Sequence, residues 1–253
     1  MHWNGERYPA RRSGTAARGK MPCMNAPRFP SGPTPHADTP QAPRRPAATA
    51  NHTEQHRTPH KDEIALLEPF DRLGLDRITL VTTAAEADRA CAAIAGAPAW
   101  GFDTESKPTF VRDEVSDGPH IVQLAALEHA WVFQLHEPDC RARVAELLAL
   151  RGVTKAGFGL GDDTKRIQRK LGVQPADVLE LNTVFRQRGY RKDMGVKGAV
   201  AVLFNRRFIK SKKAATSNWA NPRLTEAQLV YAANDAWAAL RVFHALGSPA
   251  AER

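Results

Sequence analysis

The feature that most constrains the fold is a series of short apolar segments, one of which, AWGFDTE (99–105), ends with two carboxylates. An apolar run of this length predicts a buried strand. Successive side chains of a strand point to opposite faces, so Asp103 and Glu105 share one face. Two buried carboxylates side by side repel each other unless a cation neutralises them. The segment therefore predicts a metal site at the end of a strand.

The other apolar segments predict a sheet covered by helices. The predicted strands are 77–81, 99–105, 120–127, 130–135 and 153–161, and the predicted helices are 83–96, 141–152, 162–172 and 225–246, with further helices between the last two. Only Glu128 and His129 separate the third and fourth strands, which predicts an antiparallel hairpin. Capping boxes begin the helices at Thr83 and Thr225. This order predicts an α/β fold with a mixed sheet.

The composition divides the chain at about residue 62. Residues 1–62 hold more than half of the 18 prolines, and this predicts a disordered tail before one globular domain at 63–253. Of the formal net charge of +9, about six charges belong to the tail and about three to the domain. The tail is interpreted as a solvated extension, or as the result of a start codon assigned too early, since Met21 and Met24 could each be the true start. A weak electrostatic tether to nucleic acid is the alternative.

The cysteines and the hydropathy bear on the compartment. Cys23, Cys91 and Cys140 are far apart and form no CxxC pair, which argues against a disulfide framework and a zinc site. No apolar run approaches the roughly 18 residues of a membrane span, and the N-terminus lacks the apolar core of a secretory signal. We therefore expect a cytoplasmic protein without a membrane partner, although the Arg-rich start could imitate a transit peptide.

Two later segments supply further carboxylates. Tyr231 and Asp235 are four residues apart on the last predicted helix, on a face whose small apolar residues should turn toward the core. In KAGFGLGDD, Asp162 and Asp163 begin another predicted helix, so one acid can cap the helix while the other binds a metal. The glycines here are spaced GxGxG, whereas the motif of a dinucleotide-binding site requires GxGxxG. This mismatch argues against a dinucleotide-binding site.

The order of these motifs resembles the Tyr-containing branch of the DnaQ-like 3′–5′ exonucleases, over about residues 75–246. The matching segments are FDTE with IVQLA, then KAGFGLGDDTKRI, then SNWANPRLTEAQLVYAANDAWAAL. SNW favours the Werner-type subgroup over the more distant ribonuclease D. Ser106 and Lys107 depart from the large residue that usually follows the Glu. The resemblance implies a ribonuclease H-like mixed β-sheet flanked by helices.

The resemblance also implies a catalytic set. It consists of Asp103, Glu105, Asp163, Tyr231 and Asp235, and the four acids would bind two Mg²⁺ or Mn²⁺ ions. Oxygen ligands favour these hard cations over zinc. The helix is predicted to begin at Asp163, with Asp162 as its N-cap. A free phenol has a pKa of about 10, so Tyr231 is expected to orient the attacking water and not to act as the base.

Basic residues before the last helix are the predicted contacts to nucleic acid. They lie in RQRGYRK and NRRFIKSKK, and the predicted contacts are Arg206, Arg207, Lys210, Lys212, Lys213 and Trp219. Each basic run can also be an ordinary solvated surface, and packing between helices is the preferred interpretation of Trp219.

The predicted function is a metal-dependent 3′–5′ exonuclease that acts on single-stranded or recessed 3′ ends, with DNA favoured. Two alternatives remain: RNA 3′-end processing of the ribonuclease D type, and a nuclease-like binding module without activity. The presence of all four acids and the tyrosine favours the enzyme. Unwinding of a duplex would require a helicase partner in trans.

Overall fold

The computed structural model describes residues 56–109 and 117–247. They belong to the second of two units into which the chain divides, Asn51–Arg253. Most of the predicted tail lies outside the described residues. Its predicted end at residue 62 falls inside helix α1 (Lys61–Ala65), and the ring of His56 already stacks on that of Tyr190, with centroids 5.2 Å apart. Contacts within the domain therefore begin by residue 56.

A six-stranded mixed sheet lies at the centre of the domain. Its strands are β1 (Ile78–Val81), β2 (Ala99–Glu105), β3 (Ile121–Ala125), β4 (Ala130–Gln134), β5 (Thr154–Gly157) and β6 (Val178–Glu180). Their spatial order is β1-β4-β3-β2-β5-β6. The strand β3 runs antiparallel to β2 and β4, while the other neighbours are parallel. The predicted hairpin and the predicted α/β class are confirmed.

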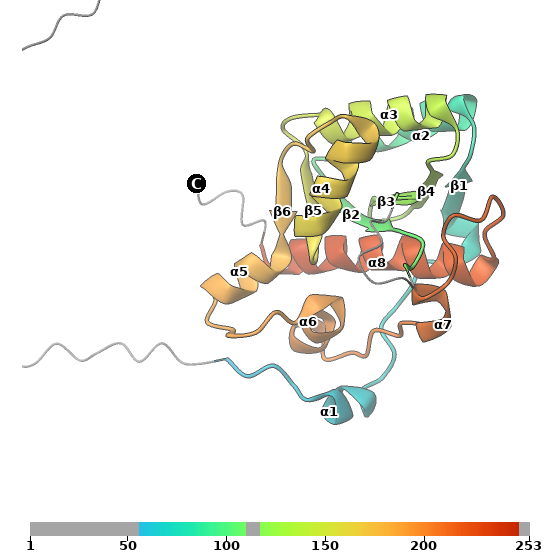
Figure 1. The fold of residues 1–253 in the computed structure, drawn as a ribbon. Coiled ribbons are helices and arrows are strands. Elements are labelled where there is room, and N and C mark those ends of the chain that lie inside the picture. Colours follow the sequence, from blue (N-terminus) through green and yellow to red (C-terminus); the bar gives the residue numbers. More distant parts are fainter. Residues whose placement is uncertain (1–55, 110–116, 248–253) are drawn as a thin grey trace, which may run out of the picture. The chain divides into compact units, whose positions relative to one another are not determined.

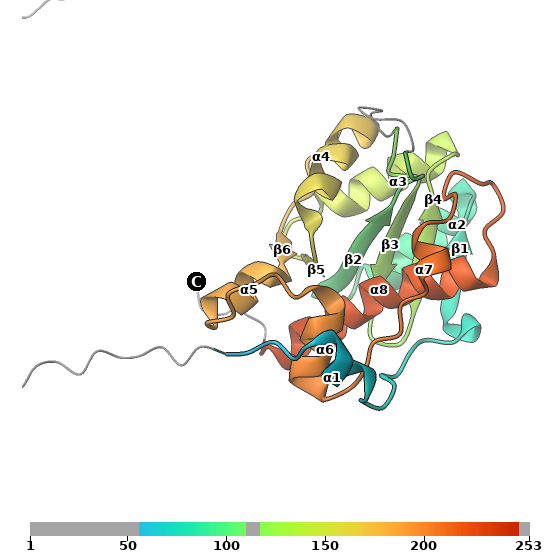
Figure 2. The ribbon, with the colours of Figure 1, turned by 60° about the horizontal axis from the view of Figure 1, so that its bottom comes forward.

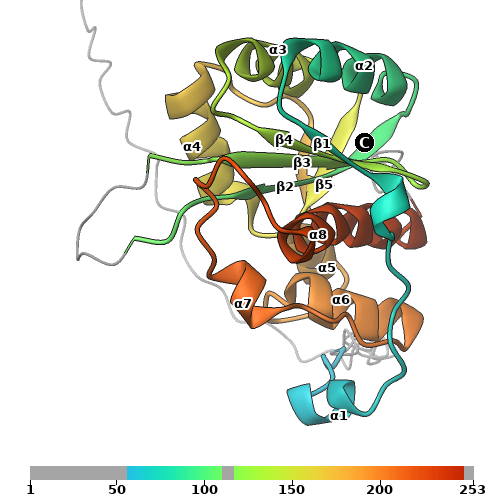
Figure 3. The same cartoon turned by 90° about the vertical axis from the view of Figure 1, so that its right-hand side faces the viewer.

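Helices cover both faces of the sheet (Figures 1 and 3). After α1 and a short 3₁₀ turn (Leu75–Arg77), they are α2 (Ala84–Ile94), α3 (Pro138–Ala149), α4 (Leu160–Leu171), α5 (Leu181–Gln187), α6 (Gly195–Phe204), α7 (Lys212–Ala215) and α8 (Glu226–Ala245). One apolar core lies between the sheet and α2, α3 and α4, and a second lies between the sheet and α8, with α5 and α6 beyond it. Figure 2 shows α8 crossing beneath the central strands.

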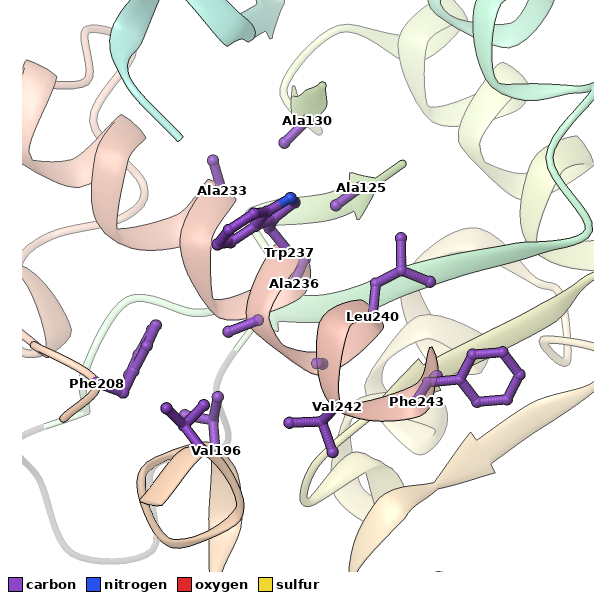
Figure 4. Close-up of a cluster of buried hydrophobic side chains, with 14 of the residues drawn as sticks. Ala125, Ala130, Val196, Phe208, Ala233, Ala236, Trp237, Leu240, Val242 and Phe243 are labelled. Carbon is purple, nitrogen blue, oxygen red and sulfur yellow. The ribbon is translucent and has the colours of Figure 1, made fainter. Parts of the chain in front are cut away.

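Helix α8 is buried on nearly all sides. Its alanines allow a close approach to the sheet, and Trp237 donates its Nε1–H to the Leu127 carbonyl at 2.7 Å. Figure 4 shows Ala233 and Trp237 facing the sheet, whereas Val196 lies on the other side of the helix. Thirteen of its twenty residues are buried, including the polar Gln228, Asn234 and Asp235, so the helix lies inside the fold and not on its surface. The predicted capping box at Thr225 is confirmed, since Gln228 N–H donates to Thr225 Oγ1 at 3.3 Å.

Two helices begin earlier than predicted. Helix α3 begins at Pro138 because proline is well suited to the first position of a helix. Helix α4 begins at Leu160, after Gly159 in the left-handed region (φ 74°). The Leu160 N–H donates to the Glu180 carboxylate at 2.7 Å, so a distant side chain caps this helix. The predicted start of α4 at Asp163 is therefore wrong. Among the described residues, no helix is long and apolar enough to cross a membrane.

The contact between β2 and α8 generates a stability prediction. A Cβ at Gly101 would lie 1.8 Å from the Ala236 carbonyl oxygen, whereas a Cβ at Gly96 would meet no heavy atom within 4 Å. We expect Gly101→Ala to lower the free energy of unfolding by about 3 kcal/mol, because backbone must move. Gly96→Ala is the matched control and should change it little. Denaturant unfolding of both variants measures this, and equal stabilities would contradict the close approach.

Candidate metal centre

Three carboxylates from two elements converge at the end of β2. Asp103 and Glu105 come from the strand, Asp235 comes from α8, and one oxygen of each lies within 4.8 Å of the others. The two strand acids share a face, as predicted, because the strand alternates. Asp235 reaches them because the next residue, Ala236, lies against Gly101. The close contact of helix and strand therefore assembles the cluster.

Burial and like charge dominate the electrostatics of this cluster. Burial raises the pKa of Asp103 well above its usual range, and the nearby charges of Asp235 and Asp163 raise it further. Burial and the charge of Asp103 raise the pKa of Glu105 to about 9. Burial also raises the pKa of Asp235, although Lys210 opposes the rise. Without a proton or a cation, these acids would repel one another at neutral pH.

The donor set fits a hard divalent cation. Asp235 is buried, and its Oδ1 accepts no hydrogen bond from any residue that the structure describes. A buried oxygen of this kind is costly unless something else binds it. Carboxylate oxygens are the ligands that Mg²⁺ and Mn²⁺ prefer. The three acids could therefore hold such an ion.

Asp163 lies beside the three converging acids but is not one of them. Its carboxylate accepts a hydrogen bond from the hydroxyl of Thr104, which stands between the two strand acids and faces the other side of the sheet. Burial raises its pKa, and the bond from Thr104 opposes the rise. Asp162 is exposed and pairs with Lys165 at 3.1 Å. Both acids lie in the first turn of α4, so Asp162 is not the N-cap that the sequence predicted.

Tyr231 lies one helical turn before Asp235. Burial and the charge of Asp235 raise the pKa of its phenol, so the hydroxyl stays protonated at neutral pH. The ring packs against Trp219, with centroids 5.9 Å apart, and Trp219 is only 1 % exposed. Trp219 is thus placed in the core, and we do not retain it as a contact to nucleic acid.

The predicted basic contacts fall in three kinds of place. Arg206, Lys212 and Lys213 are exposed. The Arg207 guanidinium donates to the Ala65 carbonyl at 2.7 Å. It therefore connects the last residue of α1 with the segment after α6. Lys210 turns inward, and its Nζ lies 2.7 Å from Asp235 Oδ2.

Two cavities meet at the acids. One, of about 560 Å³, is lined by Arg72, Ile209, Lys210, Tyr231 and Asp235 among others. The second, of about 290 Å³, is lined by Asp103, Phe158, Asn182, Lys210 and Asp235 among others. Lys210 and Asp235 belong to both, so the centre opens to space on two sides.

Sequence reasoning missed two features of this centre. It predicted Lys210 as a surface contact and did not foresee its ion pair with Asp235. It also passed over Gln123, which lies opposite Asp103 in the register of β2 and β3, is fully buried, and has no hydrogen-bond partner for its amide in the described structure. A polar residue inside the apolar strand IVQLA was the available signal for Gln123.

Comparison with known proteins identifies the family of the chain. A family model described as 3′-5′ exonuclease matches residues 78–249. The mouse bifunctional 3′-5′ exonuclease/ATP-dependent helicase WRN is 28% identical over 151 residues, which are 58% of this chain and 11% of that protein. A 3′-5′ exonuclease from Arabidopsis thaliana is 24% identical over 148 residues, which are 58% of this chain and 51% of that one. The match thus spans about a tenth of the length of the mouse protein and about half of the length of the Arabidopsis protein.

Solved structures share the fold. The Nibbler EXO domain of Aedes aegypti has a TM-score of 0.59 and 21% identity, and the match covers 70% of this chain and 89% of that one. Ribonuclease D of Trypanosoma brucei in complex with RNA U12 has a TM-score of 0.60 and 22% identity, over 67% and 62% of the two chains. The predicted ribonuclease H-like architecture is confirmed, and the chain belongs to the 3′-5′ exonuclease family.

Proposed function

We propose that the chain is a metal-dependent 3′–5′ exonuclease that hydrolyses nucleic acid from its 3′ end, with DNA as the favoured substrate. The observation that carries this proposal is the convergence of Asp103, Glu105 and Asp235 within 4.8 Å. Family membership supports a nuclease activity. A binding module without activity would have no need of buried carboxylates that repel one another.

Each residue of the centre has a proposed task. Asp103, Glu105 and Asp235 hold two Mg²⁺ or Mn²⁺ ions together with Asp163, which would turn from the hydroxyl of Thr104. When bound, such ions activate a water and stabilise the leaving 3′ oxygen. Tyr231 keeps its proton, so its hydroxyl can orient the attacking water but cannot accept a proton from it.

The identity of the nucleic acid is a separate proposal. The exposed side chains of Arg206, Lys212 and Lys213 would contact the phosphate backbone, a contact that does not depend on the base. The mouse relative carries a helicase within the same protein, and this supports DNA with a helicase partner in trans. The Trypanosoma brucei structure contains RNA, and this supports processing of RNA 3′ ends as the alternative.

The test of substrate uses matched DNA and RNA oligonucleotides, single-stranded and with recessed 3′ ends, labelled at the 5′ end. We expect a ladder that shortens from the 3′ end in Mn²⁺ and no digestion in EDTA. Faster digestion of RNA than of DNA would contradict DNA as the favoured substrate and would support processing of RNA 3′ ends. Absence of digestion of every substrate by a folded, metal-bound protein would support the inactive module.

Replacement of a central acid should separate activity from stability. We expect Asp103→Asn to lower the exonuclease rate by at least about 10²-fold, because a ligand charge is lost from the reaction centre. The same change should raise the melting temperature of the metal-free protein, because one repelling carboxylate has gone. Rates with labelled oligonucleotides and thermal unfolding in EDTA measure the two effects. Cleavage at the wild-type rate would contradict the assignment.

The raised pKa of Glu105 predicts how stability depends on pH. Its pKa is about 9 in the folded protein against an ordinary 4.5, so the folded state binds this proton more tightly. That stabilisation is complete below about 4.5 and is lost as the pH rises through about 9. We expect the melting temperature in EDTA to fall between pH 5 and pH 9, and Mg²⁺ or Mn²⁺ to reverse the fall.

Glu105→Gln is the control for this experiment, because it removes the titrating group and keeps its shape. The variant should show a flatter dependence of melting temperature on pH than the wild type. A wild-type melting temperature that rises steadily from pH 5 to pH 9 in EDTA would show that the cluster is not strained by its charge.

The two acids of α4 form a matched pair. Asp163→Asn keeps the hydrogen bond from Thr104 but removes the charge, so we expect the exonuclease rate to fall by orders of magnitude. Asp162→Asn removes an exposed pair with Lys165 and should leave the rate unchanged. The dependence of rate on Mn²⁺ measures both. A larger loss at Asp162 would mean that the wrong acid has been assigned.

A further inference from the structure

The backbone at Lys210 is fixed on both sides. Before it, the backbone of Arg207 makes two hydrogen bonds to the segment that precedes the sheet. The Arg207 N–H donates to the Glu68 carbonyl at 2.8 Å, and the Phe70 N–H donates to the Arg207 carbonyl at 2.9 Å. After it, Ser211 caps α7 through its hydroxyl, which accepts from Ala214 N–H at 3.2 Å. The Cα of Lys210 is therefore anchored, while its ammonium is carried on a flexible four-carbon side chain.

The Lys210 ammonium lies among the acids. Its Nζ is 2.7 Å from Asp235 Oδ2 and 5.1 Å from the centroid of the Tyr231 ring. The Lys210 side chain is 30% exposed, while that of Asp235 is only 3% exposed. Its positive charge also acts on Asp103 and Glu105, since it opposes the rise in the pKa of each. An internal cation thus already compensates part of the charge of this cluster.

An ammonium and a divalent ion cannot both use this carboxylate without repulsion. The acids that would hold a metal include Asp235, and the ammonium sits against one oxygen of that residue. The other oxygen, Oδ1, is buried and accepts no hydrogen bond from the described residues. Two like charges a few ångströms apart repel each other, and more strongly beside a buried carboxylate than in bulk water. Binding of the metal would therefore displace the ammonium.

The displaced ammonium has space on two sides of the acids. Lys210 lines both cavities that meet at the acids, so from its fixed Cα the side chain can turn from Asp235 into either space. A substrate phosphate at the metal centre would lie there, and a lysine binds phosphate as a mobile point charge.

We propose that Lys210 is an exchangeable counter-ion: it holds the carboxylates together without metal, gives up Asp235 to the divalent ion, and then binds the phosphate at the cleavage site. This inference rests on the proposed function, and it adds a competition between a side chain and the metal. The competition predicts opposite changes in two measurements, since loss of the ammonium should strengthen metal binding and weaken catalysis. A lysine that only packs, or only contacts substrate, would not produce that pair of changes.

The experiment compares Lys210→Met with the wild type in the full chain. We expect Mn²⁺, titrated without nucleic acid in a calorimeter, to bind Lys210→Met about tenfold more tightly than the wild type. The melting temperature in EDTA should fall, and the exonuclease rate at saturating Mn²⁺ should also fall. Lys210→Gln, which keeps polarity without charge, repeats the test if the methionine variant does not fold.

Two controls make the result specific. Lys165→Met removes another lysine paired with an aspartate, Asp162, at an exposed position, and should leave all three measurements unchanged. Lys210→Arg keeps the charge and should bind Mn²⁺ about as the wild type does. Unchanged or weaker Mn²⁺ binding by both neutral variants would overturn the exchange, and an unchanged rate would overturn the phosphate contact. A wild type that binds Mn²⁺ but digests no nucleic acid would overturn the proposed function, while the comparison of metal affinities still tests the exchange.

Discussion

The structure depends on one close approach, that of α8 to β2. The Ala236 carbonyl lies where a side chain at Gly101 would begin, so the helix can rest on the strand only because that residue is glycine. The alanines of α8 extend this contact along the sheet. The same contact places Asp235 beside Asp103 and Glu105. Packing and site assembly are therefore one event, and a helix held farther from the sheet would leave the acids apart.

The acids brought together in this way make the centre costly without a cation. Burial and mutual repulsion raise the pKa of Asp103, Glu105 and Asp235, while Lys210 supplies part of the compensating charge. Elsewhere the described domain has two apolar cores, one on each face of the sheet. The burial of apolar side chains in those cores offsets the free-energy cost of the repelling acids. Such a cost is common where side chains must bind a metal or a substrate.

Much of the fold could be predicted because its signals are local. The apolar segments predicted five of the six strands, the capping boxes predicted the starts of α2 and α8, and the short polar break predicted the hairpin. The start of α4 was wrong because the carboxylate that caps it belongs to Glu180, twenty residues later. The strand β6 was missed because it has only three residues and none of them is buried.

By itself the sequence determined which acids share a face. Asp103 and Glu105 alternate on a strand, and Tyr231 and Asp235 lie one turn apart on a helix, because backbone geometry fixes both periods. Only the tertiary structure decided the rest. It placed Asp163 in a hydrogen bond with Thr104, set Trp219 at 1% exposure in the core and turned Lys210 inward against Asp235. Those outcomes depend on which distant segments pack together. A basic segment has the same sequence pattern whether its lysines face solvent or a buried carboxylate.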